Sequence, residues 1–288
     1  MTQVVIFPGQ GSQSVGMGES LWKRYTQYVD IANEILGFDL ADLCLNGPEE
    51  LLNNTQNTQA AIYVVNALNY LDWRVNHSEP DIVLGHSIGQ YNAMLAAGMF
   101  SYEEGLELVK YRGELMGRYQ AGAMAAVLRI SAGELKLKLR KLDVGDQIDI
   151  ANYNSEYQTV IAGPSEAVDA VIQALQQDDV YAVRLKTSGA FHSRYMAEAM
   201  EEFQAKLLNY VFKSPVIRLF CNVTAADINL PRQALAKHLI SPVRWMQTVY
   251  NILDIDEDAD FVECGSGRTL TNILRYNRKE HTLFLRTV

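Results

Sequence analysis

The chain has 288 residues, of which 48% are hydrophobic and 20% charged, as is usual for a folded globular protein. A formal net charge of −9 and the lack of Lys- or Arg-rich runs argue against binding to nucleic acid or to an anionic membrane. Three widely spaced cysteines without a C-x-x-C pair argue against disulfides and a zinc site. The absence of a signal-like start and of a long apolar stretch favours a cytoplasmic protein.

The first part of the sequence predicts two short strands among helices. Residues 4–7 are β-branched or aromatic and predict a strand that ends in a glycine-rich turn. The apolar run 82–84 is typical of a short buried strand in a parallel sheet. Long helical patterns are found at 21–36, 60–75 and 101–119.

Ser87 follows the second predicted strand in the sequence Gly-His-Ser-Ile-Gly, and helical spacing resumes directly after it. This G-x-S-x-G spacing at a strand-to-helix turn is that of a nucleophile elbow, which lifts the serine oxygen above the sheet edge. Backbone N–H groups at the start of the helix would then stabilise a nearby oxyanion. The alternative is a glycine-rich turn with a capping serine.

From residue 122 the pattern changes to β-α-β-β-α-β, which predicts a ferredoxin-like unit inserted in a larger α/β body. We therefore predict a small domain at 122–189 and a large domain at 1–121 and 190–288. The rest of the large domain is predicted to contain, in order, a helix at 193–210, a strand at 216–225, a helical stretch at 233–254, a strand at 259–267 and a closing helix.

A serine nucleophile needs a base, which is usually a histidine, and the chain has five. We expect surface or structural roles for His77, His238 and His281, and a bracing role for His86. His192 lies where the small domain returns to the large one, a place where loops line clefts. On position alone, His192 is either the base or a helix-capping neighbour. No acidic residue stands at an obvious third position, so a dyad is as credible as a triad.

Arg112 interrupts an apolar stripe on the predicted helix 101–119. Leu108 and Met116 lie four residues before and after it and therefore share its face. A guanidinium that faces the interior needs a partner, and its planar fork suits a carboxylate. An internal Asp or Glu and the carboxylate of a substrate both fit this requirement.

Eight segments, in this order, resemble the malonyl-CoA:acyl-carrier-protein transacylase family: FPGQGSQ, GHSIGQY, RGELM, GAMAAV, IANYNS, GAFHS, SPVRW and ECGSG. The match runs almost end to end. The compact length and the segment GAFHSRYM are most similar to the free-standing, trans-acting acyltransferases of polyketide synthases. The resemblance implies an α/β-hydrolase-like large domain with the ferredoxin-like domain inserted in it, and an active site between them.

The resemblance also implies roles for individual residues. Ser87 matches the family nucleophile, and His192 matches the catalytic base. Arg112 matches the arginine that binds the free carboxylate of malonyl. Gln10 and the main-chain amide of Ile88 match the oxyanion hole.

Four further positions are read from the same resemblance. Phe191 stands where members that take methyl-branched units carry a smaller residue, so malonyl is expected over methylmalonyl. Arg244 stands where a main-chain carbonyl orients the histidine, so its side chain is not expected to matter. Gln90 replaces the usual glutamate and Ser266 the usual proline, and neither touches a catalytic role.

The implied activity is that of an acyltransferase, an acyl-carrier-protein S-malonyltransferase. It moves malonyl from malonyl-CoA to the phosphopantetheine thiol of an acyl carrier protein through a malonyl-serine intermediate, and supplies extender units to a polyketide synthase. We expect a monomer without cofactor or metal. The alternatives are a proofreading acyl hydrolase of the same fold, a malonyltransferase of primary fatty-acid synthesis, and a catalytically silent protein that docks carrier domains. The retained arginine argues against the hydrolase, because an unpaired buried charge facing a neutral acyl chain is costly.

Overall fold

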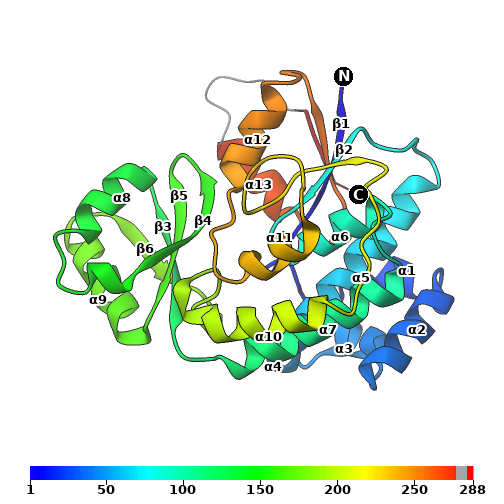
Figure 1. Cartoon of the computed structure of the whole chain (residues 1–288), viewed down its shortest axis with the longest axis horizontal. Helices are drawn as coiled ribbons and strands as arrows, with labels where there is room; N and C mark the ends of the chain where they lie inside the picture. Colours follow the sequence, from blue (N-terminus) through cyan, green and yellow to red (C-terminus); the bar gives the residue numbers. More distant parts are fainter. Residues whose placement is uncertain (277–283, 288) are drawn as a thin grey trace.

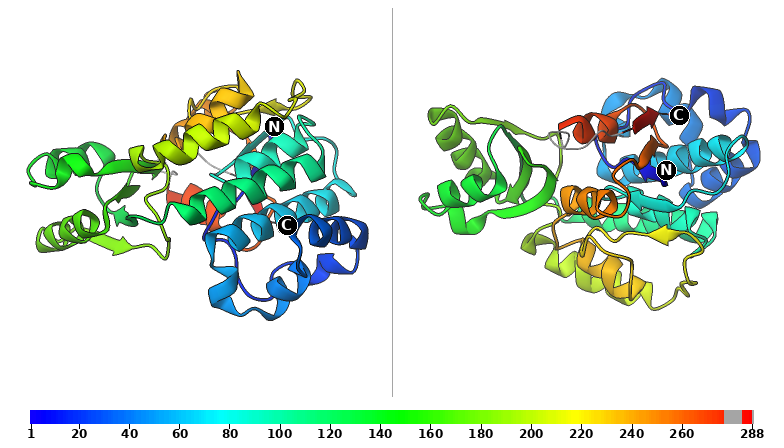
Figure 2. Two further views of the ribbon diagram at one scale, coloured as in Figure 1. Left: turned by 60° about the horizontal axis from the view of Figure 1, so that its bottom comes forward. Right: turned by 90° about the horizontal axis from the view of Figure 1, so that it is seen from above.

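The computed structural model describes residues 1–276 and 284–287, which contain two β-sheets (Figure 1). One sheet forms the middle of a large domain. The other belongs to a small domain, which projects from one side of the large domain in every view (Figures 1 and 2). This is the expected α/β architecture with an inserted domain. The exact domain boundaries stay a prediction.

The large-domain sheet is made of five parallel strands: β1 (Gln3–Phe7), β2 (Ile82–Gly85), β7 (Arg218–Leu219), β8 (Asp260–Glu263) and β9 (Phe284–Thr287). Their order across the sheet is β7-β2-β1-β8-β9. The register pairs Phe7 with Gly85 and Ile6 with Glu263, so the strands β1, β2 and β8 end at the same edge. The loops that follow these three strands therefore meet there.

Helices cover both faces of this sheet. They are α1 (Glu19–Trp22), α2 (Thr26–Leu36), α3 (Leu40–Asn46), α4 (Glu49–Leu52), α5 (Thr55–Arg74), α6 (Gly89–Ala96), α7 (Tyr102–Arg118), α10 (Ala197–Leu207), α11 (Pro231–His238), α12 (Trp245–Leu253) and α13 (Thr269–Tyr276). Side chains alternate along a strand, so β1 contributes to two cores. Val5 and Phe7 pack with α5, α6 and α7, whereas Val4 and Ile6 pack with α12 and α13.

The small domain has the predicted β-α-β-β-α-β order: β3 (Ala123–Leu128), α8 (Ala132–Leu139), a 3-10 turn η1 (Gly145–Gln147), β4 (Asp149–Ser155), β5 (Gln158–Gly163), α9 (Ser165–Gln177) and β6 (Tyr181–Arg184). Its antiparallel strands are ordered β4-β5-β3-β6, the arrangement of a ferredoxin-like fold. Aliphatic side chains of the sheet and both helices form a separate core. The chain then returns to the large domain through a second 3-10 turn, η2 (Arg194–Met196).

Two predicted elements after residue 210 are shorter than expected. Within the strand predicted at 216–225, only Arg218–Leu219 form a strand, β7. These two residues pair with Ile82 and Val83 of β2. The helical stretch predicted at 233–254 is divided into α11 and α12. Pro242 lacks the N–H that a continuous helix needs, and Val243 instead pairs with β4 of the small domain through hydrogen bonds to residues 151 and 153.

The helix predicted at 21–36 is also divided, into α1 and α2. The indole of Trp22 packs over Gly18, and its Nε1 donates to the Met17 carbonyl at 3.1 Å.

Among the described residues, no helix combines the length and apolarity that crossing a bilayer requires.

Candidate functional site

Ser87 lies between the end of β2 at Gly85 and the start of α6 at Gly89, so the predicted strand-turn-helix is confirmed. Its φ of 52° lies in the left-handed region, which is strained for a residue with a side chain. A Cβ on Gly85 would come within 1.9 Å of the Gly89 backbone, and one on Gly89 within 2.1 Å of the Phe7 carbonyl oxygen. Only glycines therefore allow so sharp a turn beside β1.

His192 lies next to this serine. The Ser87 hydroxyl donates a hydrogen bond to His192 Nε2 at 2.7 Å, and His192 Nδ1 donates to the main-chain carbonyl of His238 at 2.8 Å. The expectation that residue 244 supplies this carbonyl is wrong. Arg244 is the N-cap of α12, and its carbonyl accepts from the N–H and hydroxyl of Thr248. No carboxylate is hydrogen-bonded to His192 among the described residues, so this part of the chain supplies Ser87 and His192 without a third, acidic member.

The environment of His192 keeps its imidazole neutral. Burial, followed by the positive charge of Arg112, lowers the pKa of His192 to about 3. The neutral ring can accept the proton of Ser87. The ring of His238 lies 4.9 Å away, and its nitrogens have no hydrogen-bond partner among the described residues. Burial also lowers the pKa of His238, so two neutral imidazoles pack against each other.

Arg112 points inward from α7, as its place in the apolar stripe predicts, and is 1% exposed. One guanidinium nitrogen, Nη1, donates to Gln59 Oε1 at 2.6 Å, and Nη2 lies 3.5 Å from the Ser87 hydroxyl oxygen. The guanidinium carbon also lies 5.8 Å from the centre of the Tyr91 ring. Its Nε has no partner, and within residues 1–276 and 284–287 no Asp or Glu forms an ion pair with it. An internal carboxylate, one of the two open alternatives, is therefore excluded for this part of the chain.

The oxyanion hole expected at Gln10 and Ile88 stays a prediction. The loop after β1 is pressed against the elbow, since a Cβ on Gly9 would lie 2.4 Å from the His86 carbonyl oxygen. The N–H groups of Gln10 and Ile88 form no hydrogen bond among the described residues. The Ser87 N–H, in contrast, donates to Asn222 Oδ1 at 2.9 Å. Gln10 and Ile88 are thus the two predicted residues whose amides stay unengaged at this edge.

Phe191, the residue before His192, is 3% exposed, and its ring packs against Gly189. It sits directly beside the dyad in the chain. Its effect on substrate choice stays a prediction. Ser266 follows Gly265, whose absent Cβ leaves room for Pro8, but nothing in the structure explains the serine itself.

The other histidines stand outside the dyad. His86 Nε2 donates to Asn154 Oδ1 of the small domain at 2.8 Å, which confirms that it braces the elbow. His77 is exposed, stacks on Trp73 and hydrogen-bonds to the Trp73 carbonyl. His281 lies outside the described residues.

Three contributors to the site are not among the predicted residues: Gln59, Asn222 and the carbonyl of His238. Gln59 is fully buried one residue before the predicted helix 60–75, a polar residue on a buried face, as Arg112 is. A polar residue on an otherwise apolar helix face is a pattern that the sequence alone shows. Asn222 and His238 contact residues 135 and 46 positions away, and no local spacing marks them.

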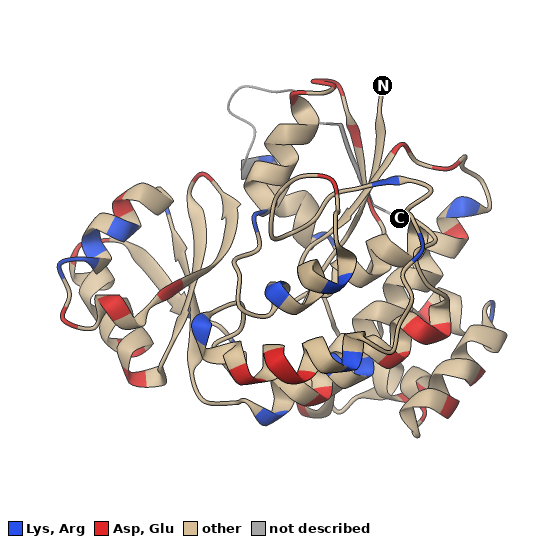
Figure 3. Ribbon diagram, viewed as in Figure 1, with Lys and Arg blue, Asp and Glu red and all other residues tan. Residues whose placement is uncertain are grey.

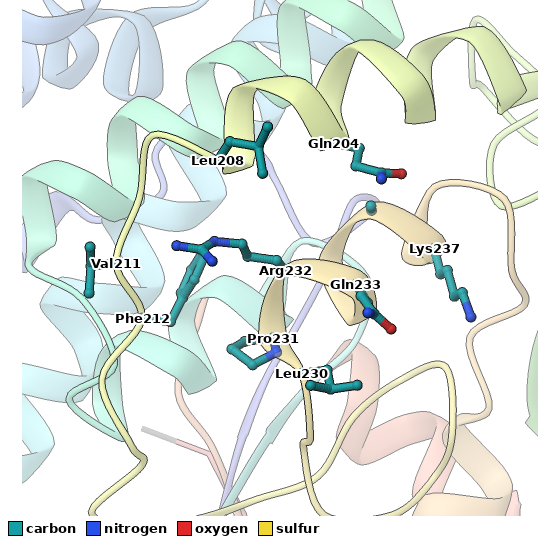
Figure 4. A pocket seen from close by; sticks show the side chains of 10 residues that line it. Gln204, Leu208, Val211, Phe212, Leu230, Pro231, Arg232, Gln233 and Lys237 are labelled. Atoms are coloured by element: carbon teal, nitrogen blue, oxygen red, sulfur yellow. The ribbon is translucent and has the colours of Figure 1, made fainter.

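A cavity of about 700 Å³ lies elsewhere, between α10, α11 and the chain that joins them (Figure 4). It shares no residue with the surroundings of Ser87, and its lining consists of Gln204, Leu208, Val211, Phe212, Leu230, Pro231, Arg232, Gln233, Ala236 and Lys237. No group of three or more His, Cys, Asp or Glu suited to a metal ion is found in the part of the chain that the structure describes.

Comparisons with known proteins show the family to which the chain belongs. The profile of the acyl transferase domain family matches residues 4–280. The chain is 39% identical over 280 residues to the polyketide biosynthesis malonyl CoA-acyl carrier protein transacylase PksC of Bacillus subtilis, covering 96% of each protein. It is 44% identical over 274 residues to the polyketide biosynthesis protein ThaF of Burkholderia thailandensis, a match that spans 94% of this chain and only 24% of ThaF.

Solved structures give the same result. A malonyl CoA-acyl carrier protein transacylase from Burkholderia pseudomallei has a TM-score of 0.95 and 37% identity over 98% of this chain and 99% of that one. A malonyl-transacylase solved in complex with its type II polyketide synthase acyl-carrier protein has a TM-score of 0.93 and 30% identity, over 100% of this chain and 96% of that one. This chain thus belongs to the acyl transferase domain family, among relatives of the malonyl-CoA:acyl-carrier-protein transacylases of polyketide biosynthesis.

Proposed function

We propose that this protein transfers malonyl from malonyl-CoA to the phosphopantetheine thiol of an acyl carrier protein by a ping-pong reaction on Ser87. The observation that carries the proposal is Arg112, a buried guanidinium 3.5 Å from the Ser87 hydroxyl with no carboxylate partner among the described residues. A charge in that place requires an anion. Malonyl thioesters carry one at the far end of the acyl group from the carbonyl that Ser87 attacks.

In the first half-reaction, Ser87 Oγ attacks the thioester carbonyl while His192 Nε2 takes the hydroxyl proton. The resulting oxyanion accepts hydrogen bonds from the N–H groups of Gln10 and Ile88. Collapse of the tetrahedral intermediate breaks the carbon–sulfur bond. His192 then gives its proton to the departing coenzyme A sulfur, which leaves malonyl esterified to Ser87.

In the second half-reaction, the thiol of the carrier's phosphopantetheine attacks the same carbonyl. His192 accepts the thiol proton and returns it to Ser87 Oγ as the ester bond breaks. The carrier leaves with malonyl as a thioester. No redox or metal step is needed, and the proposal includes no resident cofactor.

In both half-reactions, the malonyl carboxylate binds Arg112 through the edge of the guanidinium that has no partner in the protein. Its negative charge offsets the arginine, which otherwise lowers the pKa of His192. Substrate binding thus makes His192 a stronger base when the proton of Ser87 must be removed.

The finer parts of the proposal concern specificity and setting. Phe191 crowds the α-carbon of the acyl group, so malonyl is preferred to methylmalonyl. The relatives named for polyketide biosynthesis favour extender-unit supply to a polyketide synthase over primary fatty-acid synthesis. Three buried, unpaired cysteines fit a reducing compartment, and we place the reaction in the cytoplasm.

Intact-protein mass spectrometry tests the proposal. Malonyl-CoA alone should add one malonyl group to Ser87, and a holo-carrier protein should then remove it and gain the same mass. Acetyl-CoA under matched conditions is the control. An adduct that water removes as fast without a carrier would indicate a hydrolase, and no adduct at all would indicate a docking protein.

A further inference from the structure

Asn222, in the loop after β7, bridges both sides of the turn that holds the nucleophile. Its Oδ1 accepts a hydrogen bond from the Ser87 N–H at 2.9 Å, and its Nδ2 donates to the Gly85 carbonyl at 2.6 Å. These two backbone groups lie on either side of His86. The side chain is 3% exposed, so water does not compete for these bonds. A strained residue such as Ser87, with a φ of 52°, persists only when its surroundings hold it in place.

Gln90, in the first turn of α6, holds Asn222 in turn. Its Oε1 accepts from the Asn222 N–H at 3.0 Å, and its Nε2 donates to the Phe220 carbonyl at 3.2 Å. Gln90 is 2% exposed. Both ends of its amide are therefore satisfied by the loop that carries Asn222. The helix that starts at the elbow and the loop that braces it are joined by four hydrogen bonds through two side chains.

We propose that Asn222 and Gln90 are positioning residues for the nucleophile. They fix the Ser87 backbone so that its hydroxyl meets His192 at 2.7 Å. They also occupy the Ser87 N–H, so the next N–H, that of Ile88, is the one left for an oxyanion. Neither side chain touches the substrate in this assignment. The kinetic form of the proposal rests on the proposed function, but the geometry of Ser87 does not.

The amide at position 90 matters because it donates and accepts at once. A carboxylate there accepts from the Asn222 N–H but has no proton for the Phe220 carbonyl. The replacement Gln90→Glu should keep one of the two bonds, and Gln90→Leu should lose both. At position 222, Asn222→Asp keeps the bond from Ser87 N–H and sets an oxygen against the Gly85 carbonyl, while Asn222→Leu keeps the size and removes both bonds.

The experiment measures the rate at which Ser87 becomes acylated in a single turnover, together with the KM for malonyl-CoA. Asn222→Leu and Asn222→Asp should lower the acylation rate about 10- to 100-fold, because small misplacement of a reacting atom is costly. Gln90→Leu should lower it by about 10-fold and Gln90→Glu by less. KM should change little, because Arg112 and its surroundings are untouched. Partial unfolding would lower the amplitude of the single turnover and not its rate constant, so a lower rate constant at an unchanged KM indicates a positioning role.

Asn251→Leu is the matched control. Asn251 Nδ2 donates to the Ala225 carbonyl of the same loop at 2.7 Å but makes no contact with the elbow, so neither rate nor KM should change. Wild-type acylation rates in Asn222→Asp and Gln90→Leu, both folded by circular dichroism, would overturn the proposal.

A fluorophosphonate probe separates this proposal from the function. Its rate of labelling at Ser87 needs no malonyl, and it should fall in the same order among the four variants. Labelling that slows in the variants while wild type takes no malonyl would sustain the positioning role and reject the malonyl assignment. Equal labelling in all variants would reject the positioning role whatever the substrate.

Discussion

The arginine beside Ser87 and an arginine of the small domain differ in burial and in ion pairing. Arg112 is 1% exposed, shares the core with apolar side chains and has no carboxylate partner among the described residues. Arg184, on β6, is exposed and forms an ion pair with Asp169 of α9. Helix α8 carries charges of both signs, whereas the charged residues of α9 are acidic (Figure 3).

This difference separates residues that bind from residues that stabilise. An exposed ion pair is screened by water and contributes little to the free energy of unfolding. A buried, unpaired guanidinium costs stability until an anion reaches it. This destabilising guanidinium lies beside the strained Ser87 and the neutral His192. The core of the small domain, in contrast, is aliphatic. Substitutions on the two sides of this comparison should therefore change different quantities.

The largest effect is expected at the dyad. Ser87→Ala should abolish the acyl-enzyme, because the attacking oxygen is gone and the turn accepts alanine as it accepts serine. His192→Ala should lower transfer by about 10⁴-fold or more, and the double variant should be no slower than the slower single variant, since the two residues act as a unit. Intact mass and single-turnover kinetics check both. A double variant that is much slower than either single variant would contradict the dyad.

Arg112→Ala should give the next largest effect and a change of specificity. Loss of the buried partner of a carboxylate costs about 3–5 kcal/mol, so kcat/KM for malonyl-CoA should fall by about 10²- to 5 × 10³-fold. Acetyl-CoA has no carboxylate, and its slow reaction should stay level or improve. Circular dichroism serves as the folding control. Equal losses for both substrates would mean that Arg112 serves the fold and not the acyl group.

Acid should destabilise the protein through its buried histidines. Burial lowers the pKa values of His192, His86 and His238 below the 6.5 of an exposed imidazole. Below pH 6.5 the unfolded chain binds protons that the folded chain does not, so the free energy of unfolding falls as pH drops towards about 3. Each histidine adds a slope of at most about 1.4 kcal/mol per pH unit, reached where it is protonated in the unfolded chain and neutral in the folded chain.

Urea unfolding between pH 7 and pH 5 measures this slope, and His238→Gln should flatten it. A free energy of unfolding that stays constant over this range would mean that the histidines are protonated in the folded protein. That result would also remove the argument that His192 is ready to accept a proton.

The smallest effect is expected on the small domain. Arg184→Ala breaks the exposed pair with Asp169 and should change the free energy of unfolding by less than about 1 kcal/mol. Malonyl transfer should stay at the wild-type rate. Urea unfolding and the transfer assay check the two statements. A marked loss of transfer would show that the outer face of the small domain serves the reaction, and the comparison would then fail.

Local patterns predicted the parts of the site that sit on regular elements. Ser87 was marked by a strand before it and a helix after it, and Arg112 by a stripe with a helical period. Asn222 and the His238 carbonyl were not predictable in this way, because their roles depend on contacts between distant segments. The resemblance to the family places this carbonyl at residue 244, and the structure corrects that expectation. Helix α11 ends at His238, and the carbonyl of that residue accepts the hydrogen bond from His192 Nδ1.

The three cysteines have a practical consequence for the study of this protein. Cys44, Cys221 and Cys264 are all buried and free, and burial raises the pKa of Cys44 to about 12 and that of Cys264 as well. Thiolates react with disulfide reagents, and protonated, buried thiols do not. Coenzyme A released in the first half-reaction can therefore be monitored continuously with a coloured thiol reagent, and the native protein should add little background.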